Sequence, residues 1–251
     1  MADERIVFSV LIADVPVEIR CRYKQNKAFF REYITDAAPL YSVEPQEEDL
    51  IRMRDSFVRL NEREGKESPL YQRWFLENSA IHDMLADAVA REGVILMHGS
   101  ALSMDGEAYI FTAPSGTGKS THTRLWREAF GERCFMINDD KPMLRLAGGR
   151  FRVYGTPWNG KHGLGRNCSA PLRAIVSLTR DTHNHIEPLS KAEAFQVLMR
   201  QVYSPGTVFK MQTLLELETA LINSTDFFVL GCNMEAEAAI IAYRGIVGGS
   251  Q

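Results

Sequence analysis

The sequence predicts an α/β protein whose core is a mixed β-sheet that carries a phosphate-binding loop, with a smaller β-rich part at the N-terminal end. Beyond residue 93, short apolar runs typical of buried strands alternate with amphipathic segments of helical period. Glycine pairs such as Gly148-Gly149 join some of these runs as hairpins, which indicates antiparallel neighbours beside parallel ones. We expect an N-terminal β-rich region with a connecting helix over residues 1–92, and a nucleotide-binding domain over residues 93–251.

Composition narrows the class of protein. The chain has 251 residues, of which 45% are hydrophobic, enough for one large domain with a smaller attachment. The formal net charge of −3 gives no general attraction to nucleic acid or to an anionic membrane. No apolar run approaches the ~20 residues of a membrane span, and the charged start is unlike a signal peptide. The four cysteines have no paired spacing. A cytoplasmic enzyme without nucleic-acid or membrane partners is therefore expected.

The N-terminal region begins with a predicted β-hairpin. Apolar and polar residues alternate over residues 5–23 on both sides of a short turn at Ala13-Asp14. Further strands of the same small sheet are expected between residues 23 and 68, of which the very polar stretch 62–68 is a loop or linker. Residues 69–92 have helical periodicity, with Pro69 suited to the first turn and Gly93 to the end.

The main domain alternates strands and helices. Apolar runs predict strands over residues 94–97, 108–112, 134–137, 143–146, 151–154, 174–178, 185–189 and 227–230. Helical periodicity predicts helices over residues 120–130, 190–203, 207–222 and 234–246. Ser190 and Glu193 have the spacing of a capping box at the start of the second of these helices. Residues 155–167 are expected to form a loop.

A phosphate-binding pattern stands between the strand 108–112 and the helix that follows it. It corresponds to Walker A, with Ala113 in place of the usual first glycine. Glycines let such a loop curl so that its N–H groups point at phosphate oxygens, and the helix adds its positive end. Lys119 is expected to reach the β- and γ-phosphates, and Ser120 to bind Mg²⁺. The alternative is a plain Gly/Ser turn. The predicted nucleotide-binding residues are Ser115, Gly116, Thr117, Gly118, Lys119, Ser120 and Thr121.

Two adjacent carboxylates, Asp139 and Asp140, end the strand 134–137 about twenty residues after Lys119. A rigid carboxylate beside a phosphate loop suits Mg²⁺, and we expect Ser120 and Asp139 as its ligands. Simple nucleotide binding does not need a second carboxylate, which could instead accept the proton of an attacking hydroxyl. The pattern leaves open which aspartate has which role, and the alternative is a solvated acidic turn.

Histidines and a glycine-rich loop complete the candidate residues. If the strand 94–97 neighbours the strand 108–112, His98 lies at the same sheet edge as Lys119; otherwise it is structural. Three further histidines lack acidic or cysteine partners at ligand spacing and are expected on the surface: His122, His183 and His185.

The loop 155–167 could close over phosphates or an acceptor, or it could be a solvated connector. Its predicted substrate-contacting residues are Trp158, Lys161 and Arg166.

These motifs occur in a recognisable order: His98-Gly99-Ser100, Asp105-Gly106, the phosphate loop and then Asp139-Asp140. Over roughly residues 94–180 this order resembles bacterial HPr kinase/phosphorylase and its smaller relatives. The core is also similar to the nucleotide-binding part of phosphoenolpyruvate carboxykinase, whose loop likewise contains Ser-Gly-Thr-Gly-Lys. The chain departs from HPr kinases in its glycine-rich loop, where Thr-Pro-Trp and Lys161 replace an acidic, Arg-containing signature. A clear HPr-docking segment is also lacking, so HPr itself is not the expected substrate.

The resemblance implies an HPr kinase/phosphoenolpyruvate carboxykinase type of core that uses ATP and Mg²⁺. His98, Lys119, Asp139 and Asp140 match the family's catalytic residues. The implied activity is a serine kinase that transfers the γ-phosphoryl group to a hydroxyl of an unidentified protein or peptide. Alternatives are a kinase of a small molecule, such as free serine or a sugar, the reverse reaction, and a non-catalytic nucleotide switch or adaptor. The family tends to assemble, which implies a homo-oligomer.

Overall fold

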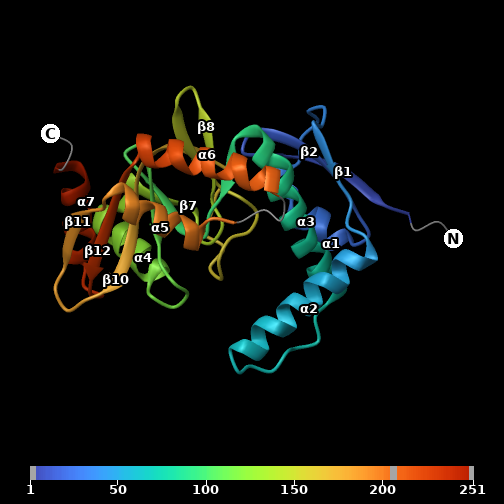
Figure 1. Ribbon diagram of the computed structural model, residues 1–251, viewed down its shortest axis with the longest axis horizontal. Coiled ribbons are helices and arrows are strands. Elements are labelled where there is room, and N and C mark those ends of the chain that lie inside the picture. Colours follow the sequence, from blue (N-terminus) through green and yellow to red (C-terminus); the bar gives the residue numbers. More distant parts are fainter. Residues whose placement is uncertain (1–3, 204–207, 249–251) are drawn as a thin grey trace. The chain divides into compact units, whose positions relative to one another are not determined.

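The computed structural model describes residues 4–203 and 208–248. The chain divides into two compact units, Met1–Val89 and Ala90–Gln251 (Figure 1). The first contains a three-stranded sheet with helices, and the second contains a nine-stranded sheet with helices. The architecture is therefore mixed α/β with a small N-terminal sheet, as the sequence predicts.

The predicted N-terminal hairpin is confirmed. Strand β1 (Ile6–Ile12) pairs antiparallel with β2 (Val15–Cys21), with Ile12 opposite Val15. Ala13 and Asp14 form the turn at φ values of 48° and 60°, the left-handed region that a tight hairpin requires. Strand β3 (Tyr41–Val43) adds to β2 in parallel, and helix α1 (Lys24–Phe29) follows the hairpin.

The expectation of further strands between residues 23 and 68 is mostly wrong. Only β3 is a strand there, and most of the second half is helix α2 (Glu47–Arg63). Gln46 and Asp49 form a capping box that starts α2. Leu50, Met53 and Phe57 then lie at helical spacing and pack in one cluster with residues of α3 (Arg73–Val89). This packing overrides the broken hydrophobic pattern, and α3 itself corresponds to the predicted helix 69–92.

The large sheet of the second unit is mixed. Strand β10 runs parallel to β6 and β12, while the other recorded strand pairs are antiparallel. The strand order is β4-β8-β9-β10-β6-β5-β7, with β12 paired to β10 and β11 to β12. The strands are β4 (Val94–Leu96), β5 (Ser100–Met104), β6 (Glu107–Thr112), β7 (Cys134–Asn138), β8 (Met143–Ala147), β9 (Arg150–Tyr154), β10 (Ser169–Arg180), β11 (His185–Pro188) and β12 (Asp226–Cys232).

Helices cover both faces of this sheet (Figure 1). On one face, α4 (Lys119–Phe130) and α7 (Glu237–Gly248) pack on alternate residues of the central strands, around the fully buried Trp126. On the other face lie α5 (Lys191–Gln201), with its predicted Ser190–Glu193 capping box, and α6 (Val208–Ser224). Thr207, the expected first residue of α6, lies outside the described residues.

One strand is missing from the sequence prediction, and this changes a neighbour relation. Strand β5 lies between β6 and β7, and all five of its residues are buried, including Ser100 and Ser103. Buried serines make the segment look like a turn in the sequence. Strand β4 pairs with β8, so it does not neighbour β6 as the placement of His98 assumed.

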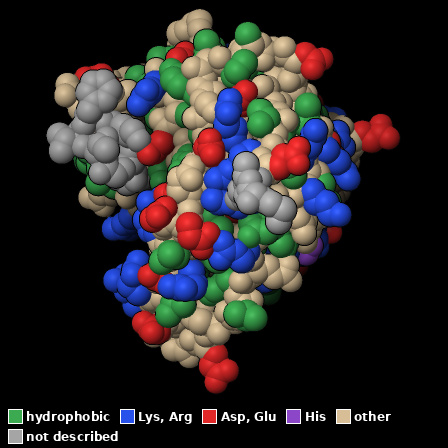
Figure 2. Space-filling model, turned by 90° about the vertical axis from the view of Figure 1, so that its right-hand side faces the viewer, with side chains coloured by type: hydrophobic (Ala, Val, Ile, Leu, Met, Phe, Trp, Pro, Cys, Tyr) green, Lys and Arg blue, Asp and Glu red, His purple; other side chains and the backbone are tan. Residues whose placement is uncertain are grey.

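Within the described ranges, the helices are too short or too polar to cross a bilayer. On the face shown in Figure 2, basic and acidic side chains are interspersed rather than gathered into a patch of one sign. This distribution agrees with the small net charge of −3.

Candidate functional site

The predicted phosphate loop lies where β6 ends at Thr112 and α4 begins at Lys119. Gly116 and Gly118 have φ values of 79° and 128°, which L side chains rarely adopt, so both positions require glycine. Ala113 does not have a positive φ and is buried, which explains why alanine is accommodated at the first position of the pattern. Lys119 Nζ donates to the Ala113 carbonyl oxygen at 2.8 Å, so this lysine folds back along the β6–α4 loop.

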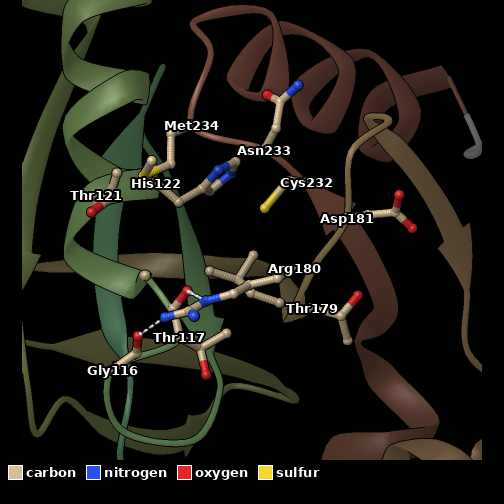
Figure 3. Close-up of a pocket in the computed structure, with 12 residues that line it drawn as sticks. Gly116, Thr117, Thr121, His122, Thr179, Arg180, Asp181, Cys232, Asn233 and Met234 are labelled. Atoms are coloured by element: carbon tan, nitrogen blue, oxygen red, sulfur yellow. Dashed lines mark hydrogen bonds between the residues drawn. The ribbon is translucent and has the colours of Figure 1, made fainter.

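An arginine that the sequence analysis did not single out holds the β6–α4 loop from a neighbouring strand. Arg180 is the last residue of β10, which lies beside β6. Its Nη2 donates to the Gly116 carbonyl at 2.6 Å, and its Nε to the Thr117 carbonyl at 3.4 Å (Figure 3). Because the two strands are parallel, both end at the same edge, and this pairing is the signal that could have found Arg180.

Asp139 lies between two hydroxyl groups. Its Oδ1 accepts from Ser100 Oγ at 2.8 Å, and Ser120 Oγ lies 3.2 and 3.3 Å from the two carboxylate oxygens. The residue is 6% exposed, so its charge stands in a sheltered position beside the start of α4. Hydroxyl and carboxylate oxygens are hard ligands of the kind that Mg²⁺ prefers. Ser120 and Asp139 therefore fit that ion. The described residues contain no cluster of three or more histidine, cysteine, aspartate or glutamate ligands.

Asp140 points to a different partner. His98 Nδ1 lies 3.3 Å from Asp140 Oδ1, with the two side chains 41% and 35% exposed. The backbones are joined too, since the Gly99 N–H donates to the Asp140 carbonyl at 3.0 Å. Thr112 Oγ1 donates to the His98 carbonyl at 2.9 Å, which ties His98 to the end of β6. His98 thus reaches the candidate site although β4 does not neighbour β6.

Burial and neighbouring charges together set the net pKa values of two of these groups, Asp140 and Lys119, below their ordinary values. Burial raises the pKa of Asp140, but the hydrogen bond from His98 and the charges of Lys141, His98 and Lys119 outweigh it, so the net pKa lies below its ordinary value. Burial lowers the pKa of Lys119, while Asp140 and Asp139 oppose that change. Asp140 is therefore a carboxylate at neutral pH.

Asn138, which the sequence analysis passed over, organises the surroundings of both aspartates. Its Oδ1 accepts from the backbone N–H groups of Asp140 at 2.9 Å and Lys141 at 2.7 Å. Its Nδ2 donates to the Thr156 Oγ1 at 3.0 Å and to the carbonyls of Thr156 and Trp158 at 3.1 and 3.3 Å. The fully buried side chain thereby fixes the turn that carries the two carboxylates and one end of the glycine-rich loop.

The glycine-rich loop, residues 155–167, contains no helix or strand and passes over Asp139. A Cβ placed on Gly160 would lie 3.0 Å from the Asp139 carbonyl oxygen and 3.1 Å from its Oδ2, so the close approach favours glycine there. Of the predicted substrate residues, Trp158 is half-buried and Lys161 is exposed. Arg166 lies over the Phe135 ring at 4.7 Å, so its guanidinium is directed to β7 rather than to the aspartates.

Two pockets lie on either side of the start of α4. The first, of about 490 Å³, is lined by Gly116, Thr117, Gly118, Thr121, His122, Leu178, Thr179, Arg180, Asp181, Cys232, Asn233 and Met234 (Figure 3). The second, of about 420 Å³, is lined by Ser120, Thr121, Thr123, Arg124, Arg127, Asp139, His162 and Leu164. Only the second contains one of the paired carboxylates.

One histidine prediction is wrong. His122 is 2% exposed, because the first turn of α4 directs it inward against Phe111 and Trp126. His183 and His185 are exposed on and before β11, as expected.

Comparison with known proteins yields little. Neither a family model nor a curated protein matches the chain. Among solved structures, the HPr(Ser) kinase/phosphatase from Coxiella burnetii is similar over 62% of this chain and 99% of its own, with 9% sequence identity and a TM-score of 0.37. A likeness of this size is a distant one, and it does not establish a shared activity.

Proposed function

We propose that the chain is an ATP- and Mg²⁺-dependent kinase that transfers the γ-phosphoryl group to a hydroxyl, with a serine of a protein or peptide as the acceptor. The observation that carries this proposal is that the two adjacent carboxylates contact different partners. Asp139 faces the Ser120 hydroxyl at the start of α4, whereas Asp140 faces His98. Nucleotide binding alone accounts for the first arrangement but leaves the second without a purpose.

The donor half of the proposed site is the β6–α4 loop. Its glycines and the start of α4 offer N–H groups to the phosphates, and Lys119 is the cation that would stabilise charge on the transferred group. For that role Lys119 must leave the Ala113 carbonyl, which it contacts at 2.8 Å. Ser120 and Asp139 would hold Mg²⁺, which when bound neutralises charge on the phosphates.

The acceptor half is the pair Asp140 and His98. Asp140 takes the proton of the acceptor hydroxyl as the new O–P bond forms and the bond between the γ-phosphorus and the bridging oxygen of ATP breaks, which releases ADP. The lowered pKa of Asp140 favours its ionised form, and His98 Nδ1 orients the carboxylate from 3.3 Å. A non-catalytic switch or adaptor would need neither group.

A second candidate, a small-molecule kinase, has its own support. The pocket beside Asp139 and Ser120 has a volume of about 420 Å³, which suits a small ligand better than a protein surface. Two arginines of α4, Arg124 and Arg127, and His162 of the glycine-rich loop line it. An alcohol that carries a carboxylate or phosphate would complement the two arginines.

Incubation of the purified chain with γ-labelled ATP and Mg²⁺ tests the proposal. The acceptor panel is a cell extract, serine-containing peptides, free serine, phosphorylated sugars and HPr. We expect label on one member with the wild-type chain and none with Asp140→Asn. Binding of ATP without label on any acceptor, equal in both forms, would favour the switch or adaptor instead.

A further inference from the structure

The first pocket borders the β6–α4 loop, and neither of the paired aspartates lines it. Gly116, Thr117 and Gly118 form its border with the loop, and Arg180 fixes that border through the Gly116 carbonyl. The wall opposite α4 comes from residues at the ends of β10 and β12 (Figure 3). The pocket is therefore open to the non-phosphate part of a ligand whose phosphates occupy the loop.

His122 brings an unsatisfied donor to this pocket. Trp126 Nε1–H, which can only donate, hydrogen-bonds to His122 Nε2 at 3.0 Å, so Nε2 is the acceptor. Because Nε2 accepts that bond, it carries no hydrogen, and the single proton of the ring is therefore on Nδ1. Nδ1 is buried and has no hydrogen-bond partner in the described structure. Leaving such a donor unpaired costs about 1–3 kcal/mol.

We propose that this pocket holds the nucleobase of the donor nucleotide, and that His122 Nδ1–H donates to a ring nitrogen or carbonyl oxygen of that base. The proposal rests on the proposed function and adds to it a base-recognition residue. Figure 3 shows the imidazole of His122 extending from α4 toward Cys232 and Asn233, on the far wall of the pocket. An acceptor on a bound base would satisfy the donor that the protein leaves unpaired.

The rest of the lining suits a flat, partly apolar ring. Leu178, Cys232 and Met234 supply aliphatic and sulfur surfaces, and a volume of about 490 Å³ accommodates a base with part of its ribose. Because Nδ1 is covered, the base must displace a lining side chain to reach it.

Calorimetric titration with three ligands tests the proposal: ATP, ribose 5-triphosphate and inorganic tripolyphosphate. In His122→Phe, an aromatic ring keeps the packing against Phe111 and Trp126 but lacks both the Nδ1 donor and the Nε2 acceptor of the Trp126 hydrogen bond. We expect the Kd for ATP to rise about tenfold, as for one lost hydrogen bond to a buried donor, with unchanged Kd values for the other two ligands. Unchanged tripolyphosphate binding also shows that the variant is folded.

Three results would overturn the proposal: equal ATP affinity in wild type and His122→Phe, equal weakening of ATP and ribose 5-triphosphate, or wild-type affinity for ribose 5-triphosphate as high as for ATP. Met234→Ala is a second variant that cannot disturb the core, and it should weaken ATP about threefold and leave tripolyphosphate binding unchanged. Failure of the proposed function looks different, because the wild-type chain would then bind ATP but transfer no label to any acceptor, or would bind neither ATP nor tripolyphosphate.

Discussion

His98 Nδ1 lies 3.3 Å from Asp140 Oδ1, beside the point where β5 and β7 pair antiparallel with Ala101 opposite Asn138. His98 follows β4, and Asp140 follows β7 at the end of the strand order. The Gly99 N–H to Asp140 carbonyl bond repeats the link in the backbone. These two contacts hold the Asp140 carboxylate next to the imidazole of His98. The neighbouring carboxylate, Asp139, instead accepts a hydrogen bond from the hydroxyl of Ser120.

Asp140→Asn should abolish phosphoryl transfer and leave nucleotide affinity within about twofold, because the amide keeps the shape but cannot take a proton. Asp139→Asn is the matched comparison, and it should weaken Mg²⁺-dependent ATP binding, since it removes charge beside Ser120. Label transfer and calorimetry with and without Mg²⁺ separate the two. If the two variants behaved alike, the division of roles between the carboxylates would be wrong.

His98→Ala should make the reaction sensitive to acid. The ordinary pKa of an aspartate is about 3.9. In the wild type the pKa of Asp140 lies below that value, so kcat/KM should be flat from pH 8 down to about pH 4.5. His98→Ala removes the hydrogen bond and the charge of His98, which lower the pKa of Asp140, and leaves the burial that raises it. The acid limb of the kcat/KM profile therefore moves to higher pH. His98→Asn, which keeps a donor close to the Nδ1 position, should restore most of the flat profile. An unshifted limb in His98→Ala would return His98 to a structural role.

Lys119→Ala should reduce ATP affinity at least a hundredfold or abolish turnover, because the residue supplies the one cation placed at the start of α4 by the loop pattern. Lys141→Ala provides the control, since this lysine also lies beside Asp140 but outside the β6–α4 loop. Its ATP affinity should stay close to the wild-type value. Equal affinities in Lys119→Ala and the wild type would remove the basis of the donor site.

Local patterns made part of this architecture predictable. The hairpin 6–21 follows from strict alternation around a two-residue turn, and α5 from the Ser190–Glu193 capping box. The position of the β6–α4 loop follows from a sequence whose glycines have the positive φ values that the pattern implies. In each case the residues that determine the structure are neighbours in the chain, so their physics can be evaluated without the fold.

What escaped prediction depends on distant partners. Segment β5 forms a strand because β6 and β7 pair with its backbone on both sides, although its buried serines suggest a turn. Arg180 matters only because β10 ends beside β6, 63 residues along the chain from Thr117. His122 appeared solvent-exposed in a helix pattern, yet Phe111 and Trp126 enclose it. Apart from Trp126, which is one helical turn from His122, the deciding partners lie on other elements of the fold.

Asn138→Ala should destabilise the second unit by about 3 kcal/mol and slow phosphoryl transfer strongly. The side chain is fully buried and hydrogen-bonds to Asp140 and Lys141 on one side and to Thr156 on the other. Alanine leaves several buried backbone groups without partners, each at a cost of about 1 kcal/mol or more.

Denaturant titration followed by label transfer measures both effects. The control is Asn223→Ala, which removes one exposed contact with Lys191 and should change the free energy of unfolding by less than about 0.5 kcal/mol. A stable Asn138→Ala chain with wild-type transfer would show that the turn carrying the aspartates holds its geometry without this side chain. A stable chain with slow transfer would instead show that Asn138 acts by positioning Asp140, because only the catalytic geometry would then have been lost.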